Sequence, residues 1–236
     1  AEPTVDNINN GSYAISRPFN IATKDKKSEV TQDFINYILS EDGQKVIESN
    51  GYIKASDAGA FKSNGAKGKI VVAGSSSVTP VMEKLAESYK TVNSGAEIEI
   101  QESDSTTGMT STIDGICDIG MASRDLKDEE LEAGLTSTTI ANDGIAIIVN
   151  KENTVEDLSL DDIAKIYTGE ITNWSEVGGE DADIVLIGRG QEVVQEMVSS
   201  LLQVHLIPAS IVRSLPLQVM LSQLFPAILV QSDMHL

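Results

Sequence analysis

Residues 74–80 read Gly74-Ser75-Ser76-Ser77-Val78-Thr79-Pro80. An apolar run, residues 70–73, precedes them, and apolar residues recur at helical spacing through residues 81–89. The pattern predicts a strand, a hydroxyl-rich turn and a helix, because glycine permits a tight turn and proline suits the first turn of a helix. The free N–H groups and the dipole at such a helix start favour an anion. Simple capping of the helix by the serines is the alternative, and the stretch alone does not separate the two.

The composition is strongly acidic. With 17 Lys and Arg against 36 Asp and Glu, the formal net charge is −19. This charge argues against binding to nucleic acid or to an anionic membrane surface. A bound anion would therefore be held by local hydrogen bonds rather than by the overall field.

Cys117 is the only cysteine, which excludes an intrachain disulfide and a cysteine metal cluster. It lies in a short apolar stretch and is interpreted as a core residue rather than a nucleophile. We expect neither a signal peptide nor a membrane-spanning helix, because we find no run of about 20 apolar residues.

Before residue 70 the pattern predicts a short helix at 4–8, a strand at 13–23 and a long amphipathic helix at 28–49 with a break at Asp42-Gly43. Residues 55–69 have the composition of a linker.

From residue 70 to residue 189, strands and helices alternate. The expected strands are 70–73, 96–101, 117–122, 140–149 and 184–187, and the expected helices are 80–90, 108–115, 127–132 and one that opens at 158. This succession predicts a parallel α/β sheet with ligand-facing loops at the strand ends.

Three polar turns carry a family resemblance. They are residues 73–80, Ser103-Asp104-Ser105-Thr106-Thr107-Gly108 and Asp118-Ile119-Gly120-Met121-Ala122-Ser123-Arg124. Together with Ile166-Tyr167-Thr168-Gly169-Glu170-Ile171-Thr172-Asn173-Trp174, they resemble in order and spacing the phosphate-binding proteins of bacterial high-affinity phosphate ABC transporters. The resemblance implies an α/β fold of the periplasmic-binding-protein-like type II class, a two-lobed three-layer sandwich that clamps its ligand in a cleft.

Residues 1–54 resemble the C-terminal end of that family, through Tyr13-Ala14-Ile15-Ser16-Arg17-Pro18-Phe19 and Leu39-Ser40-Glu41-Asp42-Gly43-Gln44-Lys45. The chain therefore resembles a circular permutation in which residues 55–69 join the old termini. On this reading the first lobe spans 15–140, formed by 15–57 and 68–140. The second lobe comprises 141–236 with 1–14, and it is incomplete or rebuilt with a helical tail.

The composition changes abruptly at Gly190. All 18 glycines lie at or before this residue, and the residues after it include three acids, one arginine and no lysine. Codons compatible with residues 190–205, read from the third base, can spell Ala-Gly-Ser-Gly-Thr, the turn that the family would place here, and residues 214–236 give a second family-like stretch. We interpret residues 190–236 as a frame-shifted apolar tail, helical at 191–206 and 217–225, that favours a homo-oligomer or a domain swap.

The resemblance implies a phosphate site made of hydroxyls, backbone N–H groups and arginines. Its residues would be Ser75, Ser76, Ser77, Ser105, Thr106, Ser123, Arg124 and Arg189. Ser76 and Ser77 would donate N–H and hydroxyl groups, and Ser105 would donate a hydroxyl. The Ser-Gly-Thr donors expected after Arg189 are absent, which would weaken the clamp.

Several of these residues also fit plain structural roles. Ser105 fits a turn or a helix cap, and Arg124 fits a surface ion pair. Asp161-Asp162 fits the start of a helix better than a metal site. His205 and His235 lie in the aberrant tail and are interpreted as incidental.

The favoured function is therefore a non-enzymatic receptor for inorganic phosphate, without cofactor or metal. The resemblance implies the membrane subunits of an ABC transporter as partners and a location outside the cytoplasm, in the periplasm or at the cell surface. The alternative is a folded, functionless rearrangement or engineered product whose apolar tail drives self-association. A phosphoryl hydrolase ranks third, because nothing before residue 190 offers a histidine, a cysteine pair or an activated nucleophile.

Overall fold

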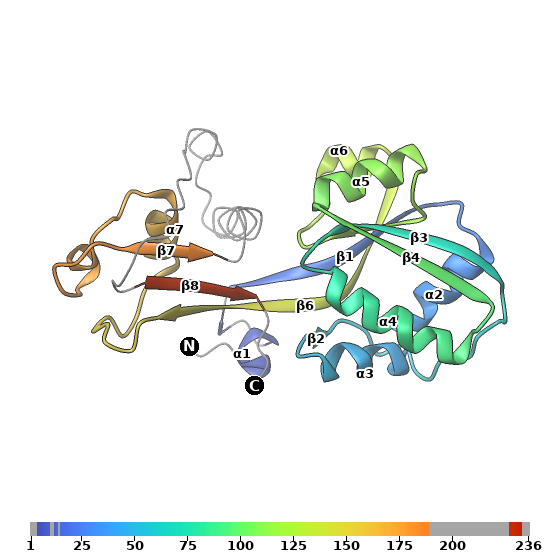
Figure 1. Ribbon diagram of the computed structural model, residues 1–236, viewed down its shortest axis with the longest axis horizontal. Coiled ribbons are helices and arrows are strands. Elements are labelled where there is room, and N and C mark those ends of the chain that lie inside the picture. Colours follow the sequence, from blue (N-terminus) through green and yellow to red (C-terminus); the bar gives the residue numbers. More distant parts are fainter. Residues whose placement is uncertain (1–3, 10–11, 14, 189–226, 233–236) are drawn as a thin grey trace. The chain divides into compact units, whose positions relative to one another are not determined.

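The computed structural model describes residues 4–9, 12–13, 15–188 and 227–232 (Figure 1). The chain divides into two compact units. The larger comprises Ser16–Gly144, and the smaller comprises Ala1–Ile15 with Ile145–Met234. Each unit is described by itself below.

A mixed six-stranded sheet forms the centre of the larger unit. Five of its strands follow the order β4 (Ala96–Ser103), β3 (Gly68–Ser75), β5 (Ile119–Ala122), β1 (Ser16–Lys24) and β6 (Leu135–Val149). The sixth, β2 (Ile53–Lys54), pairs antiparallel with β6. β3 is parallel to β4 and β5, whereas β1 is antiparallel to both β5 and β6. The expectation of a parallel sheet, made for the strands after residue 70, is therefore correct for β3, β4, β5 and β6, which run in the same direction, whereas β1, which precedes them in the chain, runs antiparallel to β5 and β6. An antiparallel strand added to a parallel set is common in α/β folds.

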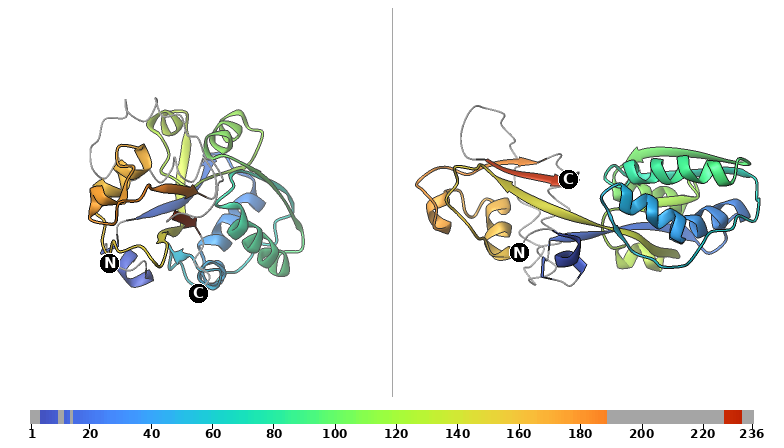
Figure 2. Two further views of the ribbon diagram at one scale, coloured as in Figure 1. Left: turned by 60° about the vertical axis from the view of Figure 1, so that its left-hand side comes forward. Right: turned by 90° about the horizontal axis from the view of Figure 1, so that it is seen from below.

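Helices cover both faces of this sheet (Figure 2). One face carries α2 (Glu29–Leu39), α3 (Glu41–Ser49) and α4 (Thr79–Val92), and the other carries α5 (Ser105–Asp114) and α6 (Asp128–Glu132). The larger unit therefore has the helix–sheet–helix layering that the strand and helix pattern predicts.

The smaller unit contains α1 (Val5–Asn9), α7 (Leu160–Thr168), a 3₁₀ turn (Trp174–Val177), and the strands β7 (Val185–Gly188) and β8 (Ala227–Ser232). β8 pairs in parallel with β7 and antiparallel with the second half of β6. Buried side chains of α7 and the 3₁₀ turn, including Tyr167 and Trp174, form its core.

Only part of the expected helical tail can be compared with the structure. The six residues of β8 form a strand, so this portion of the tail is not helical. The helices expected at 191–206 and 217–225 lie outside the described residues.

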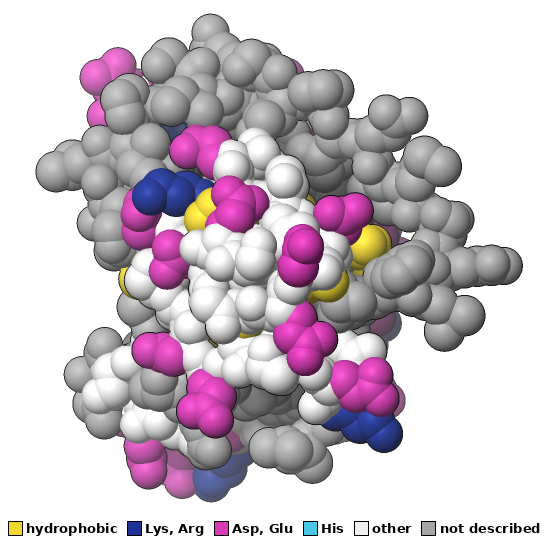
Figure 3. All heavy atoms as spheres, turned by 90° about the vertical axis from the view of Figure 1, so that its left-hand side faces the viewer, with side chains coloured by type: hydrophobic (Ala, Val, Ile, Leu, Met, Phe, Trp, Pro, Cys, Tyr) yellow, Lys and Arg dark blue, Asp and Glu magenta, His cyan; other side chains and the backbone are white. Residues whose placement is uncertain are grey.

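The smaller unit is also acidic. Residues 150–188 contain ten Asp and Glu but only two Lys. Acidic side chains are spread over the described part of the face in Figure 3, with few basic ones among them. The charge therefore gives no general attraction for anions on this face.

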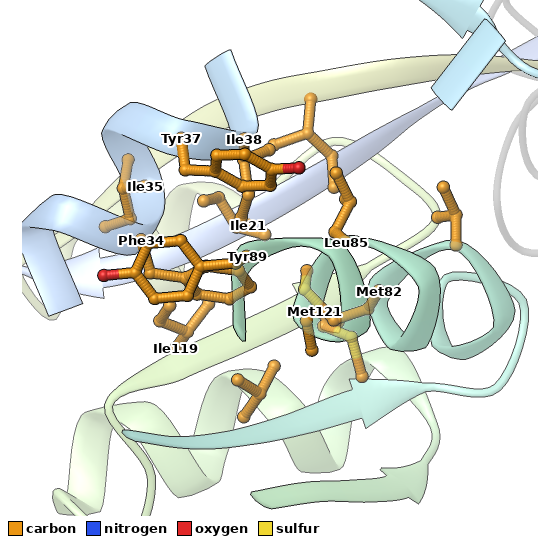
Figure 4. Packing of buried hydrophobic residues seen from close by; sticks show 14 of the residues in the cluster. Ile21, Phe34, Ile35, Tyr37, Ile38, Met82, Leu85, Tyr89, Ile119 and Met121 are labelled. Atoms are coloured by element: carbon orange, nitrogen blue, oxygen red, sulfur yellow. The ribbon is translucent and has the colours of Figure 1, made fainter. Parts of the chain in front are cut away.

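The core of the larger unit lies between the sheet and helices α2 and α4 (Figure 4). Phe34 and Tyr37 of α2 meet Tyr89 of α4, with ring centroids 5.0 and 5.3 Å apart. Met121 of β5 is also fully buried in this cluster. Because the sheet is anchored in this way, the ends of β3 and β5 have fixed positions.

The long helix expected at 28–49 is interrupted earlier than predicted. It ends at Ser40, which is both the C-cap of α2 and the N-cap of α3. Gly43 lies within α3 and does not interrupt it. It allows the start of α3 to pack closely on the end of α2, since a Cβ atom there would lie 2.2 Å from the carbonyl oxygen of Tyr37.

Of residues 55–69, expected as a linker, 68 and 69 belong to β3, and a buried carboxylate helps to hold 55–67 against α2 and α4. Asp33 of α2 accepts hydrogen bonds from Ser63 Oγ at 2.7 Å, Asn64 N at 2.9 Å and Tyr89 Oη at 2.7 Å. Phe61 packs edge-on against Tyr37, with ring centroids 5.1 Å apart. The segment has linker composition but a fixed place, because its polar groups satisfy a buried charge.

We expect Asp33→Asn to lower the free energy of unfolding by roughly 2 kcal/mol at neutral pH. Burial raises the pKa of Asp33, but the hydrogen bonds to its carboxylate outweigh burial and hold that pKa below its usual value. This stabilisation is complete above the unfolded-state pKa, about 3.9, and disappears as the pH falls through the lower folded-state pKa. Urea denaturation at several pH values should therefore show the wild-type and variant stabilities converging in acid. Asp57→Asn, which alters only an exposed ion pair with Lys54, should leave stability almost unchanged.

Candidate functional site

Three chain segments reach the same edge of the sheet in the larger unit. β3 ends at Ser75, β4 leads through Asp104 into α5, which begins at Ser105, and β5 leads directly into Ser123. Because β3 is parallel to β4 and β5, their carboxyl ends share that edge. In open α/β sheets this edge is where ligands bind.

Ser75, Ser105 and Ser123, here called the serine triad, are linked through the hydroxyl of Ser123, which contacts the hydroxyls of the other two. Ser123 Oγ is 2.8 Å from Ser75 Oγ and 3.5 Å from Ser105 Oγ. The Ser123 N–H donates to Ser105 Oγ at 3.3 Å. All three residues are at most 3% exposed. The polar turns that the sequence singled out therefore converge on one buried group of hydroxyls.

The structure assigns the helix caps to other residues. The N-cap of α4 is Val78, which makes no side-chain cap bond. The N-cap of α5 is Asp104, whose carboxylate accepts from the Thr107 N–H at 2.8 Å. Capping therefore does not explain Ser75 or Ser105, and this alternative from the sequence does not hold for them.

Ser76 and Ser77 follow β3 and are half-buried. The expected donation from the Ser76 backbone does not fit this structure, because the Ser76 N–H donates to the Ser103 carbonyl oxygen at 2.9 Å. That bond extends the β3–β4 pairing by one residue. Ser76 can therefore contact a ligand through its hydroxyl rather than through its backbone N–H.

Gly108 and Gly120 allow α5 to lie directly on the sheet beneath the triad, and Gly74 allows β3 to approach β5 closely. A Cβ atom on Gly108 would lie 2.7 Å from Gly74 Cα and 2.8 Å from the Ala73 carbonyl oxygen. A Cβ on Gly74 would lie 2.3 Å from the Met121 carbonyl oxygen, and one on Gly120 would lie 2.3 Å from Thr112 Oγ1. Close backbone contact therefore places the first turn of α5 at the ends of β3 and β5.

Arg124 forms an ion pair rather than presenting an uncompensated charge. Its two terminal nitrogens donate to Glu130 at 2.8 and 2.9 Å, and Nη2 also donates to Thr106 Oγ1 at 3.3 Å. The side chains are 19% and 7% exposed. Burial raises the pKa of Glu130, but hydrogen bonds from Arg124 and the Lys127 N–H outweigh burial and hold it below its usual value. Arg124 therefore forms the expected ion pair, but the pair is largely buried rather than at the surface.

An acidic residue, Asp104, immediately precedes Ser105 of the triad in the chain. The hydroxyl of Thr107, above all, lowers the pKa of Asp104, which stays ionised as the cap of α5. An anion bound at the triad would meet this charge as well as the favourable end of the helix dipole. Close hydrogen bonds are therefore required for binding.

The remaining candidates have structural roles or cannot be placed. Cys117 is buried, and burial raises the pKa of its thiol, as expected for a core residue. Asp162 completes a capping box with Ser159 at the start of α7, and Asp161 pairs with Lys165, which confirms their helix-terminal role. Arg189 and both histidines lie outside the described residues.

The part of the chain that the structure describes has neither a metal-ligand cluster nor a helix able to span a membrane. It contains no cluster of His, Cys, Asp and Glu that could hold a metal ion. Its helices are also too short or too polar to cross a bilayer.

Sequence reasoning missed two features of the site. It started α5 at residue 108, although Asp104 followed by Thr107 is a recognisable capping pattern that places Ser105 in the first turn. It also missed Asn20, a buried residue of β1 that contacts the Ser123–Arg124 turn. An isolated asparagine in an apolar strand gave no signal of such a contact.

Comparison with known protein families shows the family of the chain. A family model described as the PBP superfamily domain matches residues 59–202. The chain belongs to the PBP superfamily. The matched region includes β3, β4 and β5 and hence the whole serine triad.

The curated relatives within the PBP superfamily are phosphate-binding proteins. The chain is 57% identical over 175 residues to phosphate-binding protein PstS 2 of Streptococcus agalactiae serotype V, covering 74% of this chain and 60% of that one. It is 39% identical over 173 residues to PstS 2 of Streptococcus pneumoniae serotype 4, covering 73% and 59%. The chain thus spans about 60% of the length of these relatives.

Solved structures agree with this assignment. A phosphate-binding protein of a phosphate ABC transporter from S. pneumoniae TIGR4 matches with a TM-score of 0.68 and 38% identity, covering 75% of this chain and 69% of that one. A putative phosphate ABC transporter substrate-binding protein with bound phosphate, from Clostridium perfringens, matches with a TM-score of 0.57 and 38% identity, covering 70% of each. Both the fold and the sequence relate this PBP superfamily member to PstS-type phosphate-binding proteins.

Proposed function

We propose that this protein binds inorganic phosphate as the solute-binding receptor of an ABC transporter and acts outside the cytoplasm. The serine triad carries the proposal, because it gathers hydroxyls from three strand ends at one buried point. The relatives and the structural neighbours support it, since their names and titles describe phosphate binding and phosphate ABC transport. The membrane subunits of that transporter are the partners we infer.

Hydroxyl groups suit this ligand in a protein of net charge −19. Each hydroxyl can rotate to donate to a phosphate oxygen and can accept from a protonated one. The first turn of α5 adds the favourable end of a helix dipole. Hydrogen bonds to a charged group contribute roughly 1.5–3 kcal/mol each, so a few of them suffice for measurable affinity.

We infer that the ligand contacts extend beyond the triad to the residues that the sequence indicated: Ser76, Ser77, Thr106, Arg124 and Arg189. Arg124 would act from within its ion pair with Glu130. Without the Ser-Gly-Thr donors expected after Arg189, affinity would be weaker than in a complete two-lobed receptor.

The same resemblance supports a finer proposal about the origin of the chain. We infer that it is circularly permuted, with residues 55–69 joining the former termini, and that residues 190–236 derive from a shifted reading frame. Sequencing the encoding DNA tests this proposal. If the codons after Gly190 do not yield the family peptide in the alternative frame, the proposal for the tail is wrong.

Calorimetric titration with inorganic phosphate at constant ionic strength tests the function. We expect saturable heat with wild-type protein and a loss of affinity of at least about tenfold with Ser105→Ala, which removes a hydroxyl worth roughly 1.5 kcal/mol or more. Ser49→Ala, at an exposed position on α3 where the hydroxyl donates only to the Val46 carbonyl, is the matched control and should bind as wild type. A wild-type protein that gives no heat with phosphate would contradict the proposed function and favour a folded protein without a ligand.

A further inference from the structure

A buried asparagine holds the turn that carries Ser123 and Arg124. Asn20 of β1 is 1% exposed. Its Nδ2 donates to the Arg124 carbonyl oxygen at 2.9 Å, and its Oδ1 accepts from Thr139 Oγ1 at 2.7 Å. The amide therefore links β6, on one side of β1, to the turn that follows β5, on the other.

The backbone explains why this side chain reaches the turn. Asn20 lies opposite Ala122 of β5, the residue immediately before Ser123. The pairing of β1 with β6 shifts register between Phe19 and Asn20. Such an irregularity re-aims the side chains beside it, and irregularities of this kind recur next to binding sites.

An amide has the two functions that this position requires. The Thr139 hydroxyl donates to one end, which leaves the N–H group to face the Arg124 carbonyl. A carboxylate would place a second acceptor against that carbonyl, which is unfavourable in a buried site. An aspartate could satisfy the carbonyl only in its protonated form.

We propose that Asn20 is a positioning residue for phosphate binding. By holding the Arg124 carbonyl, it fixes the main chain of Ser123 and hence the distances from the Ser123 hydroxyl to Ser75 and Ser105. This inference rests on the proposed function, because the affinity that it governs is that of the serine triad for phosphate.

The principal test is Asn20→Asp, titrated with inorganic phosphate beside wild type. We expect its affinity relative to wild type to fall at least tenfold at pH about 8 and to recover in part at pH about 5, where the buried carboxyl becomes protonated and can donate. Both proteins meet the same phosphate protonation states at each pH, so the ratio isolates the protein. Asn36→Asp, the same change at an exposed position on α2, controls for the added negative charge and should leave the ratio near one.

A neutral variant separates positioning from charge. Thr139→Val, at an exposed strand position, removes the donor that orients the amide without adding charge. We expect about a threefold loss of phosphate affinity and faster amide hydrogen exchange in the peptide covering 120–127. The folding midpoint should fall modestly, because the buried Asn20 Oδ1 loses its donor, while the protein stays folded at the temperature of the titration. Thr138→Val, the neighbouring β6 position, is its control. If Asn20→Asp does not fold, the phosphate affinity of Thr139→Val relative to Thr138→Val decides whether Asn20 positions the site.

The outcomes separate a failure of the proposed role of Asn20 from a failure of the proposed phosphate binding. If wild type binds phosphate while Asn20→Asp and Thr139→Val bind as their controls do, the role of Asn20 is overturned and the proposed function stands. If wild type gives no heat with phosphate, both are overturned.

Discussion

Gly108→Ala should destabilise the protein by about 3 kcal/mol and abolish phosphate binding. The new Cβ atom would lie 2.7 and 2.8 Å from the main chain of Gly74 and Ala73, which cannot rotate away. Helix α5 would have to move off the sheet and carry Ser105 away from Ser123. Urea denaturation and calorimetric titration measure the two effects.

The direction of the change is itself informative. In an unconstrained helix, Gly→Ala stabilises by about 1 kcal/mol, so a stabilised Gly108→Ala would contradict the close contact of α5 with β3. Gly65→Ala is the control. Its φ of +74° is costly for alanine, by about 1 kcal/mol, but a Cβ there meets open space. It should lose some stability and retain phosphate affinity.

Arg124→Ala should lower stability by about 2–3 kcal/mol without phosphate present. The change leaves the buried carboxylate of Glu130 without the partner that holds its pKa low. In this variant the folded-state pKa of Glu130 should rise above the unfolded value of about 4.3. The stability deficit should therefore shrink as the pH falls toward that value, because the protonated carboxyl tolerates burial.

The double variant Arg124→Ala/Glu130→Ala provides the comparison. With both charges removed, most of the lost stability should return, since no unpaired charge stays buried. If Arg124→Ala is as stable as wild type but binds phosphate far more weakly, Arg124 acts as a direct ligand and the ion pair has little structural weight.

Much of the fold of the larger unit could be predicted from periodicity. The serine-rich turn between an apolar run and an amphipathic pattern correctly placed β3 and α4, and the alternation that followed gave β4, β5 and α6. The antiparallel β1 could not be predicted, because strand direction depends on distant pairing with β5 and β6 rather than on local pattern. The same limit hid the fixed place of residues 55–67, whose partner is Asp33, about 30 residues away in the sequence.

The site residues that lie in the three polar turns could be predicted from the sequence. Ser75 ends β3, and Ser105 and Ser123 closely follow the ends of β4 and β5, so their meeting follows from a parallel sheet. The partners that fix them were less visible. The pairing of Arg124 with Glu130 was one of two open interpretations, and Asn20 contributes through a contact to a carbonyl group that no sequence pattern marks.

The most direct measurement is a crystal structure of the protein grown with arsenate, a tetrahedral analogue of phosphate whose arsenic gives an anomalous signal. The account predicts an arsenic peak at the ends of β3 and β5, with ligand oxygens about 2.7 Å from serine-triad hydroxyls. A peak at another place, or no peak at saturating arsenate while the triad keeps its internal hydrogen bonds, would contradict it.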